Sequence, residues 1–383
     1  MIAIIMALGV VFGQAQASAA PDLAAAIDAL GAFDFPTRTI AARTVRRAPP
    51  AEAGPALARA VEGHTDEYVR FRAMVLLTAI DENAATRLAR AVLADRNDRL
   101  RTVAYQWYEH HPETGVLPLL LEALPGETSE FVRPALLRAI AAHAREDARA
   151  REALVPLVDR GEDFFRGAVI AALGEYQVRV ALDAIAAVAQ LEGPLQDDAV
   201  TALGRMGDAS ARPLLARLQN GAVPELQPSV SAALCLLEID CEARLAYLAD
   251  TIRFTVDHEE HQPLLRGAVH ALGVLAAAGR RQAMDVLVAA GHGAPDRARA
   301  PIALGIGTVA LRAPEAMLDV VSATAEPDQR ARTADLLLEG FDMLSEDFDE
   351  ERFYAAIRRA YWAAAEGSDR RATAELLIQR LEF

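Results

Sequence analysis

The chain has 383 residues, of which 52% are hydrophobic and only 5% aromatic, so Ala, Leu and Val supply most of its apolar side chains. Ala and Leu are strong helix formers, and this composition predicts an all-α protein. The formal net charge of −15 disfavours nucleic acid and anionic membrane surfaces as partners. All 39 basic residues are arginine, which excludes Schiff-base and P-loop lysine chemistry in this chain.

The N-terminal segment resembles an export signal. An apolar run over residues 2–13 is too short to cross a bilayer comfortably but has the length of a signal-peptide core. Small residues follow it and allow cleavage after Ala17 or Ala19, although no arginine precedes the run. The alternatives are a buried first helix of the fold and a retained membrane anchor. We expect residues 1–19 to be a signal peptide and the protein to be periplasmic or secreted, without membrane insertion once the signal is removed.

An arginine then recurs at near-constant spacing and each time opens an apolar helical run. Most steps are 31 to 33 residues and two are 38, which defines about eleven units. In two units in the middle of the chain the same position falls on Asp197 and Pro228, so the series is interrupted there. We call this series the arginine ladder; its members are Arg38, Arg70, Arg101, Arg133, Arg166, Arg266, Arg299, Arg332 and Arg370.

Most ladder arginines follow an acidic residue by three or four positions, which places an anion in the first turn of a helix, where free N–H groups and the macrodipole favour it. The ladder is either a cationic groove for an acidic ligand or a structural series in which each arginine pairs with the acid of its own or an adjacent repeat and holds the stack together. The acids recur in step with the arginines, which favours the structural interpretation. They are Asp34, Asp66, Asp98, Glu130, Glu162, Asp296 and Asp328.

Between the ladder helices lie partner helices with apolar residues at three- and four-residue spacing. A single helix pair cannot bury enough surface, but stacked pairs share a continuous core. We therefore predict a right-handed α-solenoid of about ten to eleven helix pairs over residues 20–340. The partner helices are expected near 53–61, 84–93, 147–158, 181–191, 209–218, 242–248 and 314–321.

The repeating unit, D-x-x-V-R-x-x-A-x-x-A-L-G-x-x-G-D, resembles HEAT repeats, in particular the short HEAT-like repeats of the phycobilisome-lyase type. Residues 202–208 (ALGRMGD) and 271–273 (ALG) match it most closely. The resemblance covers nearly the whole chain after the signal-like segment and implies an exported bacterial member of the HEAT-repeat family. It implies an architecture and says almost nothing about activity, since fold does not determine function.

Two segments depart from the repeat. The unit before Arg266 is enlarged through residues 251–261, and such insertions often lie on the binding face of a solenoid. This enlarged unit and the interrupted ladder are the candidate binding region: Asp197, Pro228, Arg253, His258, Glu259, Glu260 and His261. The second segment, residues 341–383, holds an acidic stretch at 347–351 and several aromatic residues, and we expect it to be a C-terminal capping repeat with an acidic loop.

His258 and His261 could share a helix face with the carboxylates between them, as in a metal site, but a third histidine is missing and solvated surface charge is the favoured interpretation. No metal or cofactor is predicted.

Cys235 and Cys241, the only cysteines, flank a turn between two helices. Either a disulfide or two unpaired thiols is compatible with this spacing, because a bridge requires Cα atoms within about 7 Å.

The chain contains no H-E-x-x-H, nucleophile elbow, phosphate-binding glycine loop or Rossmann motif. We therefore expect a non-catalytic scaffold that binds a protein or peptide, and no enzyme activity. HEAT-like folds also include bilin lyases and alkylpurine DNA glycosylases. The predicted export disfavours a lyase. The acidic charge and the wide separation of Trp107 and Trp362 disfavour a glycosylase.

Overall fold

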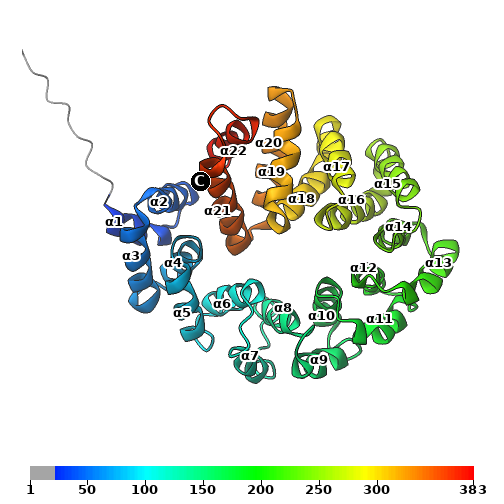
Figure 1. Cartoon of the computed structure of the whole chain (residues 1–383), viewed down its shortest axis with the longest axis horizontal. Coiled ribbons are helices and arrows are strands. Elements are labelled where there is room, and N and C mark those ends of the chain that lie inside the picture. The colour runs from blue at the N-terminus through cyan, green and yellow to red at the C-terminus, as the bar shows by residue number, and fades with distance from the viewer. Residues whose placement is uncertain (1–21) are drawn as a thin grey trace, which may run out of the picture.

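The computed structural model describes residues 22–383, and this range contains 22 α-helices, six short 3-10 helices and no strand (Figure 1). The predicted all-α solenoid of about eleven HEAT-like helix pairs is confirmed. The predicted signal peptide lies outside the described residues.

The even-numbered helices from α4 to α18 pack one against the next and face the middle of the molecule (Figure 1). These inner helices are α4 (Glu67–Ile80), α6 (Asp98–His110), α8 (Arg133–His143), α10 (Asp163–Glu175), α12 (Gln196–Met206), α14 (Gln227–Leu236), α16 (Gln262–Ala277) and α18 (Asp296–Arg312).

The odd-numbered helices form the outer layer, and each packs on its inner neighbours (Figure 1). They are α3 (Pro50–Gly63), α5 (Glu82–Ala91), α7 (Leu117–Ala123), α9 (Ala148–Leu154), α11 (Leu182–Ala189), α13 (Arg212–Gly221), α15 (Cys241–Val256), α17 (Arg281–Gly293) and α19 (Pro314–Ala323). The chain starts with α1 (Leu23–Asp28) and α2 (Phe35–Arg47) and ends with α20 (Pro327–Leu344), α21 (Asp347–Ala363) and α22 (Asp369–Arg380).

The glycine of the A-L-G motif sets the spacing of the inner helices. A Cβ atom on Gly174 of α10 would lie 2.6 Å from the Cα atom of Ala202 in α12, and one on Gly204 of α12 would lie 2.5 Å from the Cα atom of Ala233 in α14. Neither position has room for a side chain. Glycine is therefore required where one inner helix crosses the next.

The arginine ladder clamps the end of the preceding outer helix to the start of the next inner helix. Arg70 donates from Nε to the carbonyl of Val61 at 2.9 Å, and Arg166 donates in the same way to Val158 at 3.0 Å. These carbonyls are otherwise unpaired acceptors at a helix end. Arg70 also pairs with Asp95 of the next unit at 2.6 Å, and Arg101 pairs with Glu127 at 2.8 Å. These two acids come from the next repeat, whereas Arg166 pairs with Asp163 of its own helix at 2.8 Å.

In the two mid-chain units without a ladder arginine, a glutamine makes the equivalent contact to the preceding helix end. Gln196 donates to the carbonyl of Ala189 at 3.1 Å, and Gln227 donates to the carbonyls of Gln219 and Ala222, each at 3.1 Å. Each glutamine stands one residue before the predicted position and replaces the arginine clamp with an amide. In a later unit Arg330, two residues before Arg332, makes the backbone contact, to Thr324 at 2.6 Å.

The solenoid closes into a ring, because the last helices pack against the first (Figure 1). α21 contacts α4, and its Phe348 is buried within the hydrophobic core of the N-terminal half. Glu351 of α21 is fully buried and pairs with Arg46 of α2 at 2.7 Å and with Arg358 at 3.2 Å. The Arg46 guanidinium also lies 5.0 Å from the ring centre of Tyr354.

The C-terminal segment, which we predict to be a capping repeat, takes part in this closure. α20 runs without a break through residue 341, so the capping unit has no boundary there. The acidic stretch at 347–351 is not a loop but the start of α21, and Asp347, Asp349 and Glu350 lie in its first turn, where carboxylates favour the helix terminus. Asp347 pairs with Arg72 and Glu351 with Arg46, so these acids bind the first repeats and complete the ring.

Replacing Glu351 with alanine should open this closure. Arg46 and Arg358 would lose their shared carboxylate, and removing one partner of a buried pair costs about 3 kcal/mol or more. We expect the free energy of unfolding in urea to fall by this amount and the radius of gyration measured by X-ray scattering to rise. Glu382→Ala is the matched control, because Glu382 pairs with Arg43 at the exposed edge of the same seam and its loss should cost less than about 1 kcal/mol. Equal effects of the two substitutions would contradict a closure that depends on the buried pair.

Candidate functional site

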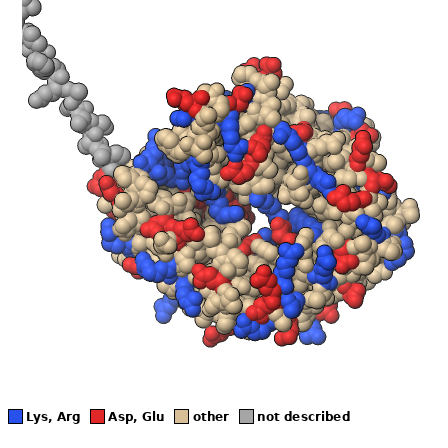
Figure 2. All heavy atoms as spheres, viewed as in Figure 1, with Lys and Arg blue, Asp and Glu red and all other residues tan. Residues whose placement is uncertain are grey.

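The middle of the ring holds a cavity of about 600 Å³ lined by residues from α6, α8, α10, α18, α20 and α21. We call it the central cavity. Figure 2 shows an opening near the middle of this face, with basic and acidic side chains around it. Since the lining helices are far apart in sequence, the cavity exists only because the solenoid closes.

A network of charged side chains forms one wall of the central cavity. Arg138 of α8 donates to Oε1 of the buried Glu109 of α6 from both Nε, at 2.8 Å, and Nη2, at 2.5 Å, and the Tyr176 hydroxyl donates to the same oxygen at 2.9 Å. Burial tends to lower the pKa of Arg138, but the Glu109 carboxylate raises it above its ordinary value. The Arg138 guanidinium therefore keeps its proton.

A second cluster of charged side chains joins α10 and α12 to α18. The Glu175 carboxylate, at the end of α10, accepts from Arg205 of α12 at 3.0 Å and from Arg312 of α18 at 3.1 Å. Burial opposes ionisation of Glu175, but the two arginines hold the pKa of its carboxyl below the usual value. Burial lowers the pKa of Arg205 to about 10 despite its bond to Glu175, and the charges of Arg312 and Arg138 add to this effect. This part of the wall therefore has more positive charge than its carboxylates neutralise.

A smaller pocket of about 260 Å³ opens beside the central cavity, and Thr308 and Arg312 line both. We call it the side pocket. Its walls come mainly from α12, α16 and α18 and combine small apolar residues with Asp198, Arg205, Arg266, His270 and Arg312. Burial, together with the charge of Asp197, raises the pKa of Asp198 to about 6, and burial lowers the pKa of His270.

The predicted binding residues do not form one site. Asp197 lies at the start of α12 next to the side pocket, close enough to act on the charge states of Asp198 and His270. Pro228 is buried in α14, where its ring faces Gly267 of α16.

The enlarged unit lies on the outer side of the ring (Figure 1). Residues 251–256, the first part of the enlarged unit, form the last turns of α15. Arg253 pairs with the neighbouring Asp250 there. Glu259 to His261 form a short 3-10 helix, and Glu260 lies 3.9 Å from His261. His258 stacks on Phe254 with ring centres 4.2 Å apart, and His261 lies 5.1 Å from the same ring.

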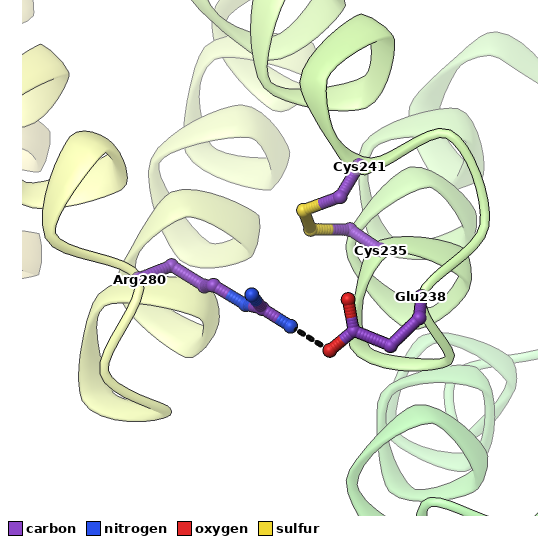
Figure 3. The surroundings of a disulfide bond; sticks show 4 residues. All are labelled: Cys235, Glu238, Cys241 and Arg280. Atoms are coloured by element: carbon purple, nitrogen blue, oxygen red, sulfur yellow. Dashed lines mark hydrogen bonds and ion pairs between the residues drawn. A yellow bond between two sulfur atoms is a disulfide. The ribbon is translucent and has the colours of Figure 1, made fainter.

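Cys235 and Cys241 form a disulfide with Cα atoms 4.2 Å apart (Figure 3). It joins the end of α14 to the start of α15, and Arg280, after α16, pairs with Glu238 in the turn between the two cysteines. The bridge lies at the junction of the two hydrophobic cores, because Ala233 belongs to the N-terminal core and Cys235 to the C-terminal one.

The residues of the central cavity were not predicted from the sequence. Their common signal is a charged residue near the C-terminal end of an apolar inner helix, as in Glu109, Glu175 and Arg205. That signal alone marks any solvated helix end. The side chains of α18 and α21 become relevant only when the ring brings them opposite α6 to α10.

Among the side chains that the structure describes, no group of three or more His, Cys, Asp or Glu is placed to hold a metal ion. Within residues 22–383, every helix is too short or too polar to cross a membrane.

No protein-family model and no curated protein matches this chain. Its fold resembles that of solved structures, among them the complex of CpcE and CpcF of phycocyanin lyase from Nostoc sp., with 19% identity and a TM-score of 0.42 over 67% of this chain and 94% of that one. YibA of E. coli has 17% identity and a TM-score of 0.41 over 56% and 81%. Importin beta has 13% identity and a TM-score of 0.37 over 94% and 61%. Likeness at this level concerns the helical-repeat architecture and carries no argument about function.

The raised pKa of Asp198 predicts a pH-dependent cost. An acid whose pKa rises from 3.8 to about 6 on folding destabilises the fold once it ionises. The cost is absent below the lower value, grows as the pH approaches 6 and then stays constant, at no more than about 3 kcal/mol. Asp198→Asn should therefore gain stability over the wild type between pH 4 and pH 6, as measured by urea unfolding. Asp159→Asn, at an exposed position in the turn before α10, is the matched control. A difference that stays flat over this range would show that Asp198 remains hydrated.

Proposed function

We propose that this protein is a non-catalytic scaffold that holds a segment of a partner protein in the central cavity of its ring. The observation that supports this proposal is the charged wall formed by Glu109, Arg138, Glu175 and Arg312. The two carboxylates are already paired with arginines, which suits recognition of a polar backbone or side chain more than proton transfer.

The dimensions of the site support a peptide over a larger surface. A cavity of about 600 Å³ is in the range of sites that enclose a small ligand or a few residues of a chain. Its lining alternates cationic and anionic groups, so an extended segment with both kinds of side chain finds partners along it. The overall charge of −15 further disfavours nucleic acid as the bound chain.

We also propose that the scaffold works in the periplasm or outside the cell. The signal-like run over residues 2–13 supports export, and the Cys235–Cys241 disulfide is consistent with an oxidising compartment. Both observations concern export alone and hold whichever protein the scaffold binds.

Photo-crosslinking tests the binding face. A benzoylphenylalanine placed at Gln106 or at Thr308, both of which line the central cavity, should form an adduct with one partner segment in an envelope extract. The same group at Arg217, exposed on the outer helix α13, is the control and should give none. Mass spectrometry of the adducts identifies the segment. Equal labelling from Arg217, or no labelling from either cavity position, would argue against binding in the ring.

Export has its own test. The whole chain, expressed in a Gram-negative host and recovered from the periplasmic fraction without reductant, should begin at Ser18 or Ala20, as determined by N-terminal sequencing. Its intact mass should correspond to the bridged form of Cys235 and Cys241. Recovery from the cytosol with Met1 retained and both thiols open to alkylation would contradict export.

A further inference from the structure

We infer that the side pocket is a subsite for the carboxyl terminus of a peptide that ends in a small aliphatic residue. The inference rests on the proposed function, because it assigns one part of the bound segment to one part of the ring.

The pocket arises where two inner helices do not pack backbone to backbone at the glycine of the A-L-G motif. Gly174 and Gly204, the glycines of two A-L-G motifs, are each in close contact with the next inner helix. Gly273, in the third such motif, is different. A Cβ atom there would meet only Cγ2 of Val309, at an ordinary contact distance of 3.6 Å, and Gly273 lines the side pocket. The space that a neighbouring backbone fills elsewhere is open at this position.

The apolar walls are built from small side chains. Ala202, Val269, Val274 and Ala277 line the pocket together with Gly305. The close approach of α16 to α18 limits its width, since a Cβ atom on Gly305 would collide with Val269. With a volume of about 260 Å³ the pocket is smaller than sites that enclose whole drug-sized ligands, but it has room for one short aliphatic residue and its end group.

The charge in the pocket favours a carboxylate. Arg205, Arg266 and Arg312 line it, against the single carboxyl group of Asp198. Arg205 and Arg312 share Glu175, whereas Arg266 has no hydrogen bond or ion pair with any other residue in the range 22–383. Ladder arginines such as Arg70 and Arg166 are used as structural clamps, so Arg266 departs from its series. An unpaired guanidinium at the mouth of an apolar pocket can bind a carboxylate with two parallel hydrogen bonds.

The position of the pocket favours a chain end over a free acid. Thr308 and Arg312 belong to both cavities, so a peptide that lies in the central cavity can turn its last residue into the side pocket. Residues of this peptide before the last one would then contact the charged wall. A free monocarboxylate would use the side pocket alone.

The experiment uses the full chain and isothermal titration with three probes. N-acetyl-Ala-Ala-Val with a free carboxylate should bind, and the same peptide with a C-terminal carboxamide should bind at least tenfold more weakly because it lacks the charge. Isovalerate, which offers only the side chain and the carboxylate, should also bind at least tenfold more weakly than the peptide acid. Equal binding of acid and amide would overturn the carboxylate subsite, and equal binding of isovalerate and the peptide acid would overturn the chain end as its occupant.

Two variants locate the binding. Arg266→Gln should weaken the peptide acid tenfold or more with little change in thermal stability, since Arg266 has no structural partner. Gly273→Leu should fill the pocket and abolish binding. Arg217→Gln and Gly221→Leu, both on the outer helix α13, are the matched controls and should bind as the wild type does, because Gly221 has open space around its Cβ position. Unchanged binding by Arg266→Gln would overturn the inference. If no peptide binds while the benzoylphenylalanine adducts still form in the central cavity, this inference fails alone and the scaffold function stands.

Discussion

The structure depends on the contact between its two ends. In an open solenoid each repeat contacts only its neighbours, so stability is a sum of local terms and the end repeats fray. Here Glu351, from the penultimate helix, is buried against Arg46 of the second helix. Burying a carboxylate and a guanidinium costs several kcal/mol in lost hydration, which their mutual attraction offsets only when both are in place. The closure therefore fixes the C-terminal helices in one alignment with the N-terminal helices. A shift of either end would leave a buried charge without its partner.

Closure also creates the candidate site. Glu175 stands at the end of α10 and Arg312 at the end of α18, 137 residues later, yet they are 3.1 Å apart. Neither lies at a ladder position, and each would be an ordinary solvated side chain in an open stack. Surrounded by the ring, the same side chains are partly desolvated, so their charges interact more strongly than at a free surface. The inner wall thus gains its electrostatic character from topology more than from composition.

This division explains what the sequence can and cannot predict. The repeat period and the helix pairs follow from local signals, because the contacts of arginines such as Arg70 and Arg166 lie within the same unit or the next one. The closure does not follow, since Asp347 and Glu351 look like any acidic helix start and their partners Arg72 and Arg46 lie about 300 residues away. The interruption at Asp197 and Pro228 was interpreted from residue type, whereas the clamp is a hydrogen-bond donor to a carbonyl, which Gln196 and Gln227 also supply. The sequence also cannot show that the first residues of the enlarged unit, 251–256, extend an outer helix.

The same A-L-G motif forms a close helix contact in one part of the ring and lines a pocket in another. Gly174 and Gly204 allow two inner helices to meet backbone to backbone, and an added side chain would separate them. At the equivalent position in α14 the chain has Cys235, which is bridged to Cys241 at the junction of the two hydrophobic cores. Beyond that junction the register of the inner helices differs, and Gly273 faces open space in place of a neighbouring backbone. The glycine of this motif brings helices together in one half of the ring and leaves a gap in the other. The gap lies beside Arg266, a ladder arginine that lines the side pocket.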